Sequence, residues 1–272
     1  MKRLSSILVL ILSAAMLLTD CGGGGGGGGT IPTSTPVSTV SAGRGPYSIT
    51  VDPSGKYLYV ADTYADTVSQ YTISANGALT SMATATVAAG KFPDSITVSP
   101  KSNYAYVANG GVNTVSQYTI GAAGSLTSMA TATVMGGMLP TSITVDPSGK
   151  YAYVANELSF GTVSQFTIGA TGSLTSMATA TVAAGTYPLS VTVDPSGKYA
   201  YVANSGDSTV SQYTIGATGA LTPMTPATVA AGRTPYAVTV DPSGKYAYVV
   251  NFYDNNVSQY TINTTGALIP NP

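Results

Sequence analysis

Several residue types are scarce or absent in this chain. It contains no histidine and no tryptophan, and cysteine occurs once. The lack of histidine excludes the commonest general base and the commonest transition-metal ligand, and a single cysteine excludes a disulfide within the chain. Charged residues make up only 8% of the sequence and the formal net charge is −1. A basic surface for nucleic acid is therefore not expected, and no nucleic-acid partner is predicted.

The N-terminal residues read as an export signal. Lys2 and Arg3 precede an apolar run, Leu4–Leu18, whose length suits the hydrophobic region of a signal peptide better than a transmembrane helix. Cys21 follows soon after and resembles the lipidated cysteine of bacterial lipoproteins, although Asp20 stands where that family has a small residue. The resemblance implies a lipid anchor on Cys21 and a location at the bacterial cell envelope or surface. An ordinary signal peptide or an uncleaved anchor is the alternative.

The sequence predicts three regions. Residues 1–20 form the signal peptide, and residues 21–36 form a tether of cysteine followed by glycine, proline and threonine. Gly22–Gly29 is an unbroken glycine run, which cannot hold regular structure and reaches roughly 15 Å as a flexible linker. Residues 37–272 are predicted to fold as one domain, tethered to a membrane partner through Cys21.

That domain is built from five near-identical repeats. They are marked by prolines 47 or 48 residues apart, at Pro46, Pro93, Pro140, Pro188 and Pro235. Each repeat contains four short runs rich in Val, Ile, Thr and Tyr, which suit β-strands. Asp-Pro-Ser-Gly and Gly-Ala-Thr-Gly segments separate them, as at 146–149 and 169–172, and both have the composition of hairpin turns. Four strands per repeat predict an all-β propeller of four-stranded antiparallel blades.

The strongest family resemblance lies in the second run of each repeat. Tyr-Val-Ala-Asn occurs at 106–109, 153–156 and 201–204, with Tyr-Val-Ala-Asp at 59–62 and Tyr-Val-Val-Asn at 248–251 as variants. This resembles the YVTN repeat of lactonase-like and surface-layer-like propellers over residues 37–268. The resemblance implies a propeller that usually has seven blades, whereas this chain has repeats for five.

The two ends of the repeat region are complementary. The last repeat reaches only the start of a fourth run, at residues 266–272, and residues 37–43 align with residues 226–232 of a complete fourth run. The N-terminal strand is therefore expected to complete the last blade and close a five-bladed ring, which would remove the open sheet edges. An open arc, or assembly between chains, is the alternative.

Differences between the repeats concentrate in two connections, which an up-and-down blade places on one face. The charged and aromatic residues there are candidates for ligand binding, because variable loops on a rigid scaffold commonly carry function. These candidates are Arg44, Tyr47, Asp62, Tyr64, Asp66, Lys91, Phe92, Asp94, Glu157, Phe160, Tyr187, Asp207, Arg233, Tyr236, Phe252, Tyr253 and Asp254. Ordinary drift of exposed loops is the alternative.

One position in each repeat ends the second run with Asp or Asn. The five residues are Asp62, Asn109, Asn156, Asn204 and Asn251. Such a ring of oxygen atoms suits a central metal or polar ligand, but Asp and Asn at strand ends more commonly satisfy nearby backbone groups. We therefore predict no metal site and no cofactor, and the sequence gives no support for Ca²⁺.

Two functions fit these observations. The tether, the uniform repeats and the lack of a catalytic motif favour a binding or structural module at the cell envelope. Its ligand would be a protein, a glycan or a small molecule held on the variable face. The alternative is a lactonase-like hydrolase on the same face, which the family resemblance implies. Glu157 and Asp207 with Arg233 would then supply acid–base chemistry.

Overall fold

The computed structural model describes residues 38–101 and 103–271, and its compact unit spans Val40–Pro272. The predicted signal, Cys21 and the glycine tether lie outside the described residues. No helix among the described residues is long and apolar enough to cross a membrane. The strands are β1 (Pro46–Val51), β2 (Tyr57–Asp62), β3 (Thr67–Ile73), β4 (Leu79–Ala88), β5 (Pro93–Val98), β6 (Tyr104–Asn109), β7 (Thr114–Ile120), β8 (Leu126–Met135), β9 (Pro140–Val145), β10 (Tyr151–Asn156), β11 (Thr162–Ile168), β12 (Leu174–Ala183), β13 (Pro188–Val193), β14 (Tyr199–Asn204), β15 (Thr209–Ile215), β16 (Leu221–Ala230), β17 (Pro235–Val240), β18 (Tyr246–Asn251), β19 (Asn256–Ile262) and β20 (Leu268–Pro270).

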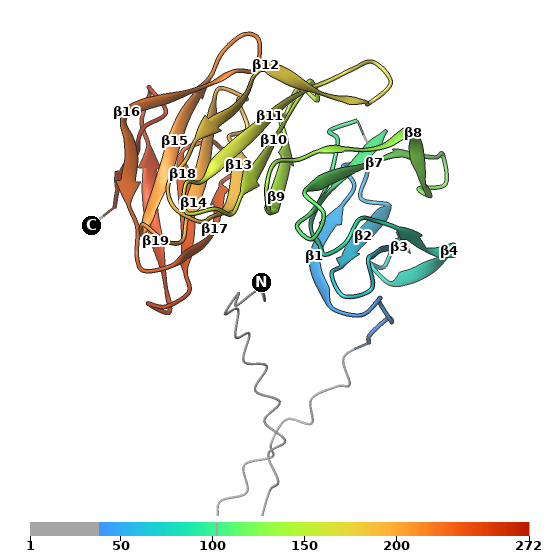
Figure 1. The fold of residues 1–272 in the computed structure, drawn as a ribbon. Coiled ribbons are helices and arrows are strands. Elements are labelled where there is room, and N and C mark those ends of the chain that lie inside the picture. Colours follow the sequence, from blue (N-terminus) through green and yellow to red (C-terminus); the bar gives the residue numbers. More distant parts are fainter. Residues whose placement is uncertain (1–37, 102, 272) are drawn as a thin grey trace, which may run out of the picture. The chain divides into compact units, whose positions relative to one another are not determined.

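These strands form five antiparallel sheets of four, one sheet per repeat, in the order in which they occur along the chain (Figure 1). The predicted all-β propeller of four-stranded blades is confirmed. The turns have the expected chemistry: Gly149 adopts a φ of 71° after Asp146-Pro147-Ser148, and Gly172 adopts 83° in the second hairpin. Asp146 secures its turn, because its carboxylate accepts hydrogen bonds from the backbone N–H groups of Lys150 and Tyr151.

Neighbouring sheets pack face to face through one repeated arrangement. Between the second and third sheets, Tyr106, Ala108 and Val115 meet Ile143, Val154 and Phe166 in a buried cluster, together with Ala152 and Leu174. Two long-range hydrogen bonds accompany this packing. The Tyr106 hydroxyl donates to the Gly172 carbonyl at 2.7 Å, and the Leu174 N–H donates to Gln117 Oε1 at 2.6 Å. The same cluster recurs at all four junctions between successive sheets.

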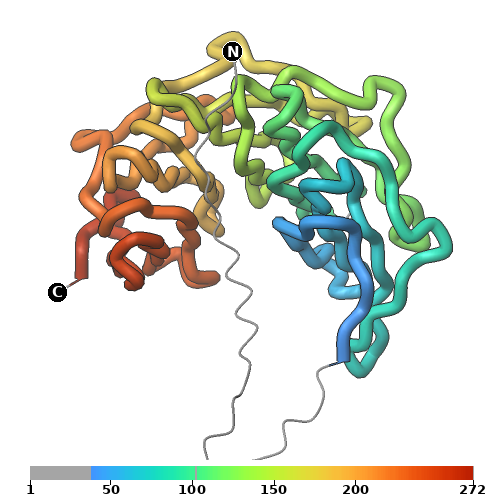
Figure 2. The backbone as a smooth tube through the Cα atoms, turned by 60° about the horizontal axis from the view of Figure 1, so that its bottom comes forward, coloured from blue at the N-terminus to red at the C-terminus, as the bar shows by residue number. Residues whose placement is uncertain are grey.

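The first strand of each sheet lies on the inner side of this succession. Contacts link β1 to β5, β5 to β9, β9 to β13 and β13 to β17. A serine side chain bridges each neighbouring pair: Ser95 Oγ accepts the Ile143 N–H at 3.1 Å, for example. Among the described residues, the fifth sheet does not pack against the first in this way. Figure 2 shows these two sheets apart, at the two ends of an arc.

The expected closure by the N-terminal strand is not formed in this structure. The fifth sheet consists of β17, β18, β19 and the short β20, with no N-terminal strand. The segment that begins at Val40 lies instead on the first sheet. There the Ser41 carbonyl accepts a hydrogen bond from the Tyr71 hydroxyl at 2.7 Å, as the Ala88 carbonyl does from Tyr118 one repeat later. β4 makes this contact with the second sheet while it also completes the first, so the N-terminal segment lies on the first sheet as a completing strand would. Closure is absent because the fifth sheet stands at the other end of the arc, away from this segment.

Candidate functional site

The two variable connections of each repeat meet at one end of the sheets, as the sequence predicts. In the second repeat the N–H groups of Gly110 and Gly111, in the loop between β6 and β7, donate to the carbonyls of Phe92 and Lys91 at 2.9 Å each. In the first repeat the N–H groups of Thr63 and Tyr64 donate in the same way to the carbonyls of Gly45 and Arg44. These backbone bonds hold the variable side chains on a defined framework.

A β-bulge places one side chain of every inner strand at this end. The pairing of each inner strand with the second strand skips the residue after the proline. Bulges commonly redirect a side chain next to a functional site. Because the inner strands are neighbours, the skipped residues are brought to the same end of consecutive strands. They are Tyr47, Asp94, Thr141, Leu189 and Tyr236.

Asp94 and Glu157 are two carboxyl groups at this end whose pKa values are raised. Asp94 is skipped by the bulge of β5, and Glu157 follows β10 in the next sheet. Burial, and next the charge of Glu157, raise the pKa of the Asp94 carboxyl to about 7, although the polar side chain of Thr63 opposes this shift. Burial also raises the pKa of Glu157. A carboxyl that titrates near neutral pH suits general acid–base catalysis.

The backbone around Asp94 leaves little space. A Cβ added at Gly110 would lie 2.5 Å from Asp94 Oδ2 and 3.4 Å from the Pro140 carbonyl oxygen, so a side chain there would displace the carboxylate from its present position. The Thr63 hydroxyl, from the first sheet, donates to the Pro93 carbonyl at 2.8 Å. Glu157 is fixed through its N–H, which donates to the Leu139 carbonyl at 2.9 Å. Three consecutive sheets therefore contribute groups around Asp94 and hold the backbone of Glu157.

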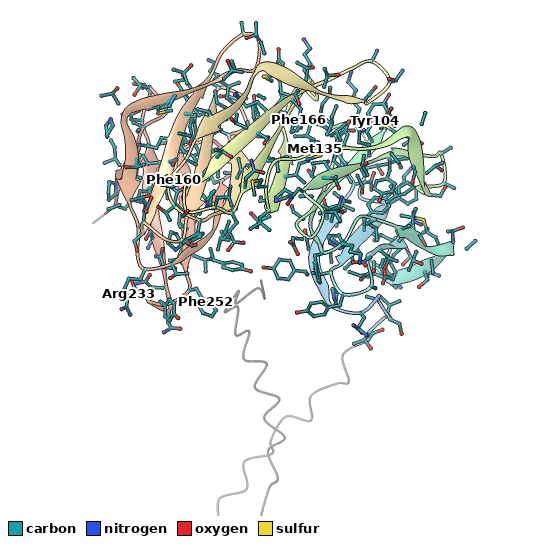
Figure 3. All side chains as sticks on the ribbon, viewed as in Figure 1. Tyr104, Met135, Phe160, Phe166, Arg233 and Phe252 are labelled. Atoms are coloured by element: carbon teal, nitrogen blue, oxygen red, sulfur yellow. The ribbon has the colours of Figure 1, made fainter. Side chains whose placement is uncertain are left out.

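A second group of candidates gathers on the fifth sheet. The ring centroids of Tyr236 and Phe252 lie 6.4 Å apart, and those of Phe252 and Tyr253 lie 5.9 Å apart. The Arg233 guanidinium lies 6.0 Å from the centre of the Tyr253 ring. Figure 3 shows Arg233 and Phe252 at the same end of this sheet. The hydroxyl of Tyr236 contacts that of Tyr47 across the space between the fifth and first sheets.

Three other predicted carboxylates secure loops. Asp207 and Asp254 occupy the same place in their repeats, and Asp66 lies one position later, where the fourth and fifth repeats have Ser208 and Asn255. Each accepts a hydrogen bond from a backbone N–H of the neighbouring connection, at Phe92, Thr186 and Arg233 respectively. Sequence reasoning could not separate these carboxylates from Asp94, since all are polar residues of variable loops.

The Asp/Asn position at the end of each second strand is buried in all five repeats. Asn109 Nδ2 donates to Ser116 Oγ at 2.9 Å, and Asp62 Oδ2 accepts a hydrogen bond from Ser69 Oγ at 2.7 Å. Asn109 Oδ1 also accepts the Gly90 N–H, from the connection that precedes its sheet, at 3.1 Å. These side chains therefore join the third strand and the preceding connection to the second strand, rather than only the local backbone groups that the sequence predicted. Asp62 in particular is fully buried, so it does not belong to the exposed binding face on which it was predicted.

The remaining candidates are exposed and dispersed. Phe160 has 89% of its side-chain surface exposed, the largest value among the exposed hydrophobic residues. Among the described residues, no ring contact links Phe160 or the other dispersed aromatic candidates to another aromatic side chain. The other dispersed candidates are Arg44, Tyr64, Lys91, Phe92 and Tyr187.

Sequence reasoning missed Thr63, Thr141 and Leu189. A signal for the last two was present, because the residue after the proline is the most variable one in an otherwise uniform inner strand: Tyr, Asp, Thr, Leu and Tyr in successive repeats. Thr63 had no such signal, since its contact with Pro93 joins two sheets. Among the described residues, no three His, Cys, Asp or Glu side chains gather as a metal site would require.

Comparison with known proteins identifies the family. The model described as "Lactonase, 7-bladed beta-propeller" matches residues 28–187 and, in a second overlapping alignment, residues 95–271. The overlap follows from the internal repeats, which can be aligned to the family in more than one register. No curated protein matches the chain.

Solved structures show the same fold. A candidate 6-phosphogluconolactonase from Bacteroides fragilis is 22% identical, with a TM-score of 0.71 over 83% of this chain and 68% of that one. A protein from Lactobacillus plantarum is 25% identical, with a TM-score of 0.72 over 84% and 70%. The periplasmic gluconolactonase of Pseudomonas aeruginosa is 20% identical, with a TM-score of 0.68 over 84% and 69%. The chain thus spans close to five-sevenths of these structures, and it belongs to the lactonase family of seven-bladed β-propellers with five blades of its own.

Proposed function

We propose that this chain hydrolyses a lactone at the Asp94–Glu157 pair. The observation that carries the proposal is the place of Asp94, which the bulge of β5 sets at the variable end of an inner strand, half-buried beside Glu157 of the next sheet. This burial also raises the pKa of Asp94 to about 7. The family match supports a hydrolase over the binding or structural module favoured by the sequence alone. The acid–base residues differ from those suggested first, because Asp207 is engaged by the Thr186 N–H and Arg233 by Asp254.

The chemistry needs one base that also serves as an acid. The ionised Asp94 carboxylate takes a proton from water while the water oxygen bonds to the lactone carbonyl carbon. When the tetrahedral intermediate collapses, the bond from that carbon to the ring oxygen breaks, and protonated Asp94 returns the proton to this oxygen. The product is the open hydroxy acid. Glu157 acts through Asp94 as a positioning residue, because its charge helps to keep the Asp94 pKa near neutral.

The test is hydrolysis of a lactone panel by the purified chain, corrected for the spontaneous reaction. The panel holds glucono-δ-lactone, its 6-phosphate and an aryl lactone. We expect kcat/KM for the accepted lactone to rise with pH through about 7 and to fall by about 10²- to 10⁴-fold in Asp94→Asn. Asp207→Asn is the control, since Asp207 lies at the same end of the sheets but accepts a hydrogen bond from a backbone N–H.

Glu157→Gln separates the two roles. Because it removes the neighbouring charge, we expect the acidic limb of the pH–rate profile to move to lower pH while the plateau rate changes little. Absence of turnover above the spontaneous rate, or full activity in Asp94→Asn, would overturn the proposal.

We also propose that the chain is exported and anchored through a lipid on Cys21. The support is the basic start, the apolar run and the cysteine followed by glycines. Metabolic labelling with a palmitate analogue tests it, with Cys21→Ser as the control. Label on Cys21→Ser, or none on the wild-type chain, would contradict this proposal.

A further inference from the structure

The fifth repeat differs from the others in the loop between its second and third strands. Residues 252–256 read Phe-Tyr-Asp-Asn-Asn, whereas residues 205–209 of the fourth repeat read Ser-Gly-Asp-Ser-Thr. The two loops have the same length, and Asn255 and Ser208 adopt φ values of 52° and 56°. Asp254 and Asp207 also make the same bond to a backbone N–H. The two loops therefore share a framework and differ in their side chains.

This loop lines a hollow of about 520 Å³. Its walls are Val250, Asn251, Phe252, Tyr253, Asn255, Asn256 and Val257. Phe252 and Tyr253 are each 65% exposed, and their rings stand nearly perpendicular, at 82°. Exposed rings of this kind present faces on which an apolar ligand surface can lie.

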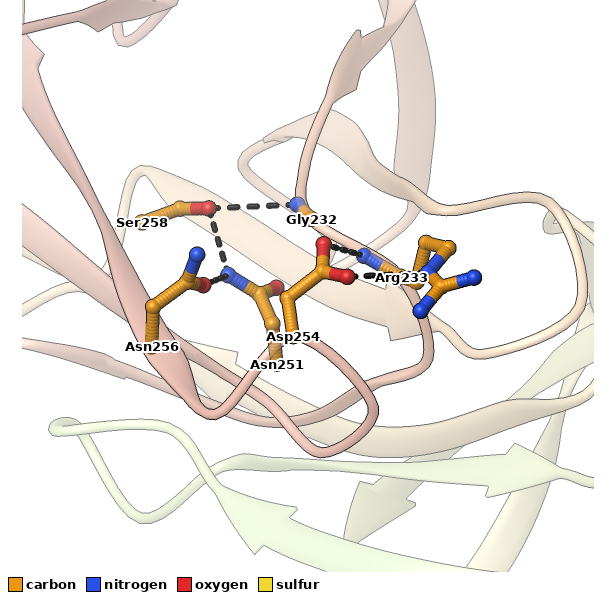
Figure 4. Close-up of polar contacts among 6 residues, drawn as sticks. All are labelled: Gly232, Arg233, Asn251, Asp254, Asn256 and Ser258. Carbon is orange, nitrogen blue, oxygen red and sulfur yellow. Dashed lines mark hydrogen bonds and ion pairs between the residues drawn. The ribbon is translucent and has the colours of Figure 1, made fainter.

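Amide groups supply the polar part of the hollow. Asn251 Nδ2 donates to Asn256 Oδ1 and to Ser258 Oγ, both at 2.8 Å, as Figure 4 shows. Asn256 itself is exposed, so its amide is accessible from solvent. Asn251 Oδ1 is buried and has no hydrogen-bond partner among the described residues. In the other four repeats the position of Asn256 is threonine, so the extra amide is specific to the fifth.

Charge beside the hollow is neutralised. Arg233 Nε lies 2.8 Å from Asp254 Oδ1, and the Arg233 N–H donates to Oδ2 of the same carboxylate at 2.7 Å. The two bonds also lower the pKa of Asp254, so the carboxylate stays ionised and paired at neutral pH. A charged ligand would have to compete with this pair, whereas a neutral one would not.

We propose that the hollow of the fifth repeat binds a neutral saccharide. A pyranose ring has a C–H face that stacks on aromatic rings, and its hydroxyl groups both donate and accept hydrogen bonds, as asparagine amides do. Phe252 and Tyr253 provide the stacking faces, and Asn255 and Asn256 provide the amides. This site is separate from the Asp94–Glu157 pair and does not depend on lactone hydrolysis.

The test measures binding to the full chain by saturation-transfer NMR and calorimetry. The ligands are maltotetraose, cellotetraose, laminaritetraose and chitotetraose. The decisive variant carries the loop of the fourth repeat: Phe252→Ser, Tyr253→Gly, Asn255→Ser and Asn256→Thr. It keeps Asp254 and a backbone that the chain already forms at 205–209. We expect at least one tetrasaccharide to bind, and its affinity to fall at least tenfold in this variant and in Phe252→Ala.

The outcomes separate this site from the proposed catalytic one. Asp94→Asn is expected to bind the saccharide as the wild-type chain does, even where lactone turnover is lost. The proposal is overturned if none of the four saccharides binds, or if binding survives the loop replacement. It is also overturned if sedimentation shows a second copy of the chain covering the hollow, seen as self-association that the loop replacement abolishes.

Discussion

The interior junctions and the two end sheets are built from the same residues but differ in burial. Tyr153, in an interior sheet, is fully buried, and its hydroxyl donates to the Gly219 carbonyl at 2.7 Å. Tyr248 stands at the same place in the fifth repeat and is 38% exposed. At the other end, Ile49 is 65% exposed, whereas Ile143 in the third repeat is 4% exposed. Each end sheet thus presents one half of the interface that every interior junction completes.

This difference in burial shows that the repeats of one chain do not contribute equally to its stability. In such a protein each unit is stabilised mainly by its neighbours, so an end unit has one interface where an interior unit has two. The first sheet is partly protected, because Val40 and Ala42 lie near Leu58 and Val60 on its outer face. The end face of the fifth sheet is the opposite half of a junction, and its Val250 and Val257 remain exposed.

The largest expected effect comes from the tyrosine pair. Tyr153→Ala is expected to lower the free energy of unfolding by about 3–5 kcal/mol, because it removes a buried ring and an inter-sheet hydrogen bond. Tyr248→Ala is expected to cost less than about 1 kcal/mol, because its ring is partly in solvent. Urea unfolding of both variants measures the difference. Equal costs would break the comparison, since they would mean that the fifth sheet is covered in solution.

A smaller effect is expected from the glutamines. Gln165 is buried and spans a junction: its Oε1 accepts the Leu221 N–H at 2.6 Å, and its Nε2 donates to the Thr179 carbonyl at 2.9 Å. Gln165→Ala leaves these groups unsatisfied and is expected to cost about 1–3 kcal/mol. Gln259 is exposed at the same position of the fifth repeat, and Gln259→Ala is expected to stay within about 0.5 kcal/mol. Thermal unfolding of the two variants compares them, and a larger loss for Gln259→Ala would contradict this account.

The smallest expected effect concerns two carboxyls. The pKa of Asp94 is raised in the folded chain to about 7, so the folded state binds this proton more tightly than the unfolded state does. Stability therefore falls as pH rises from about 4 to about 7, by on the order of 1–2 kcal/mol after allowance for solvent screening. Asp94→Asn should flatten this slope in urea titrations at several pH values.

Asp254 provides the contrast at the exposed end. Hydrogen bonds from the Arg233 N–H and then from its side chain lower the pKa of this carboxyl. Its contribution to stability is therefore present above the pKa of the unfolded state and is lost as pH falls. Asp254→Asn should leave the slope between pH 4 and 7 intact. If Asp254→Asn removed the dependence of stability on pH, this dependence would come from Asp254, and its assignment to Asp94 would be wrong.

Much of the fold could be predicted, because it is local and repeated. A turn of Asp-Pro-Ser-Gly in four repeats, and of Ser-Pro-Lys-Ser in the second, together with the alternating strand residues, specifies each hairpin within about 15 residues. The face that carries variation also followed from strand order. The pairing of Asp94 with Glu157 could not be predicted, since it joins different sheets and depends on the bulge at Pro93 and on space beside Gly110. The loop-fixing role of Asp66, Asp207 and Asp254 was hidden for the same reason.

The sequence by itself determined the number of blades, their strands and turns, and membership of a lactonase-like propeller, because each blade encodes its own four strands. The tertiary structure decided which copies of a residue are buried. Tyr153 and Tyr248 have the same local sequence, and only Tyr153 has a following sheet to pack against. It also decided that residues 40–43 lie on the first sheet rather than complete the fifth. Burial depends on the neighbour that packing supplies, and an end repeat lacks one of its two neighbours.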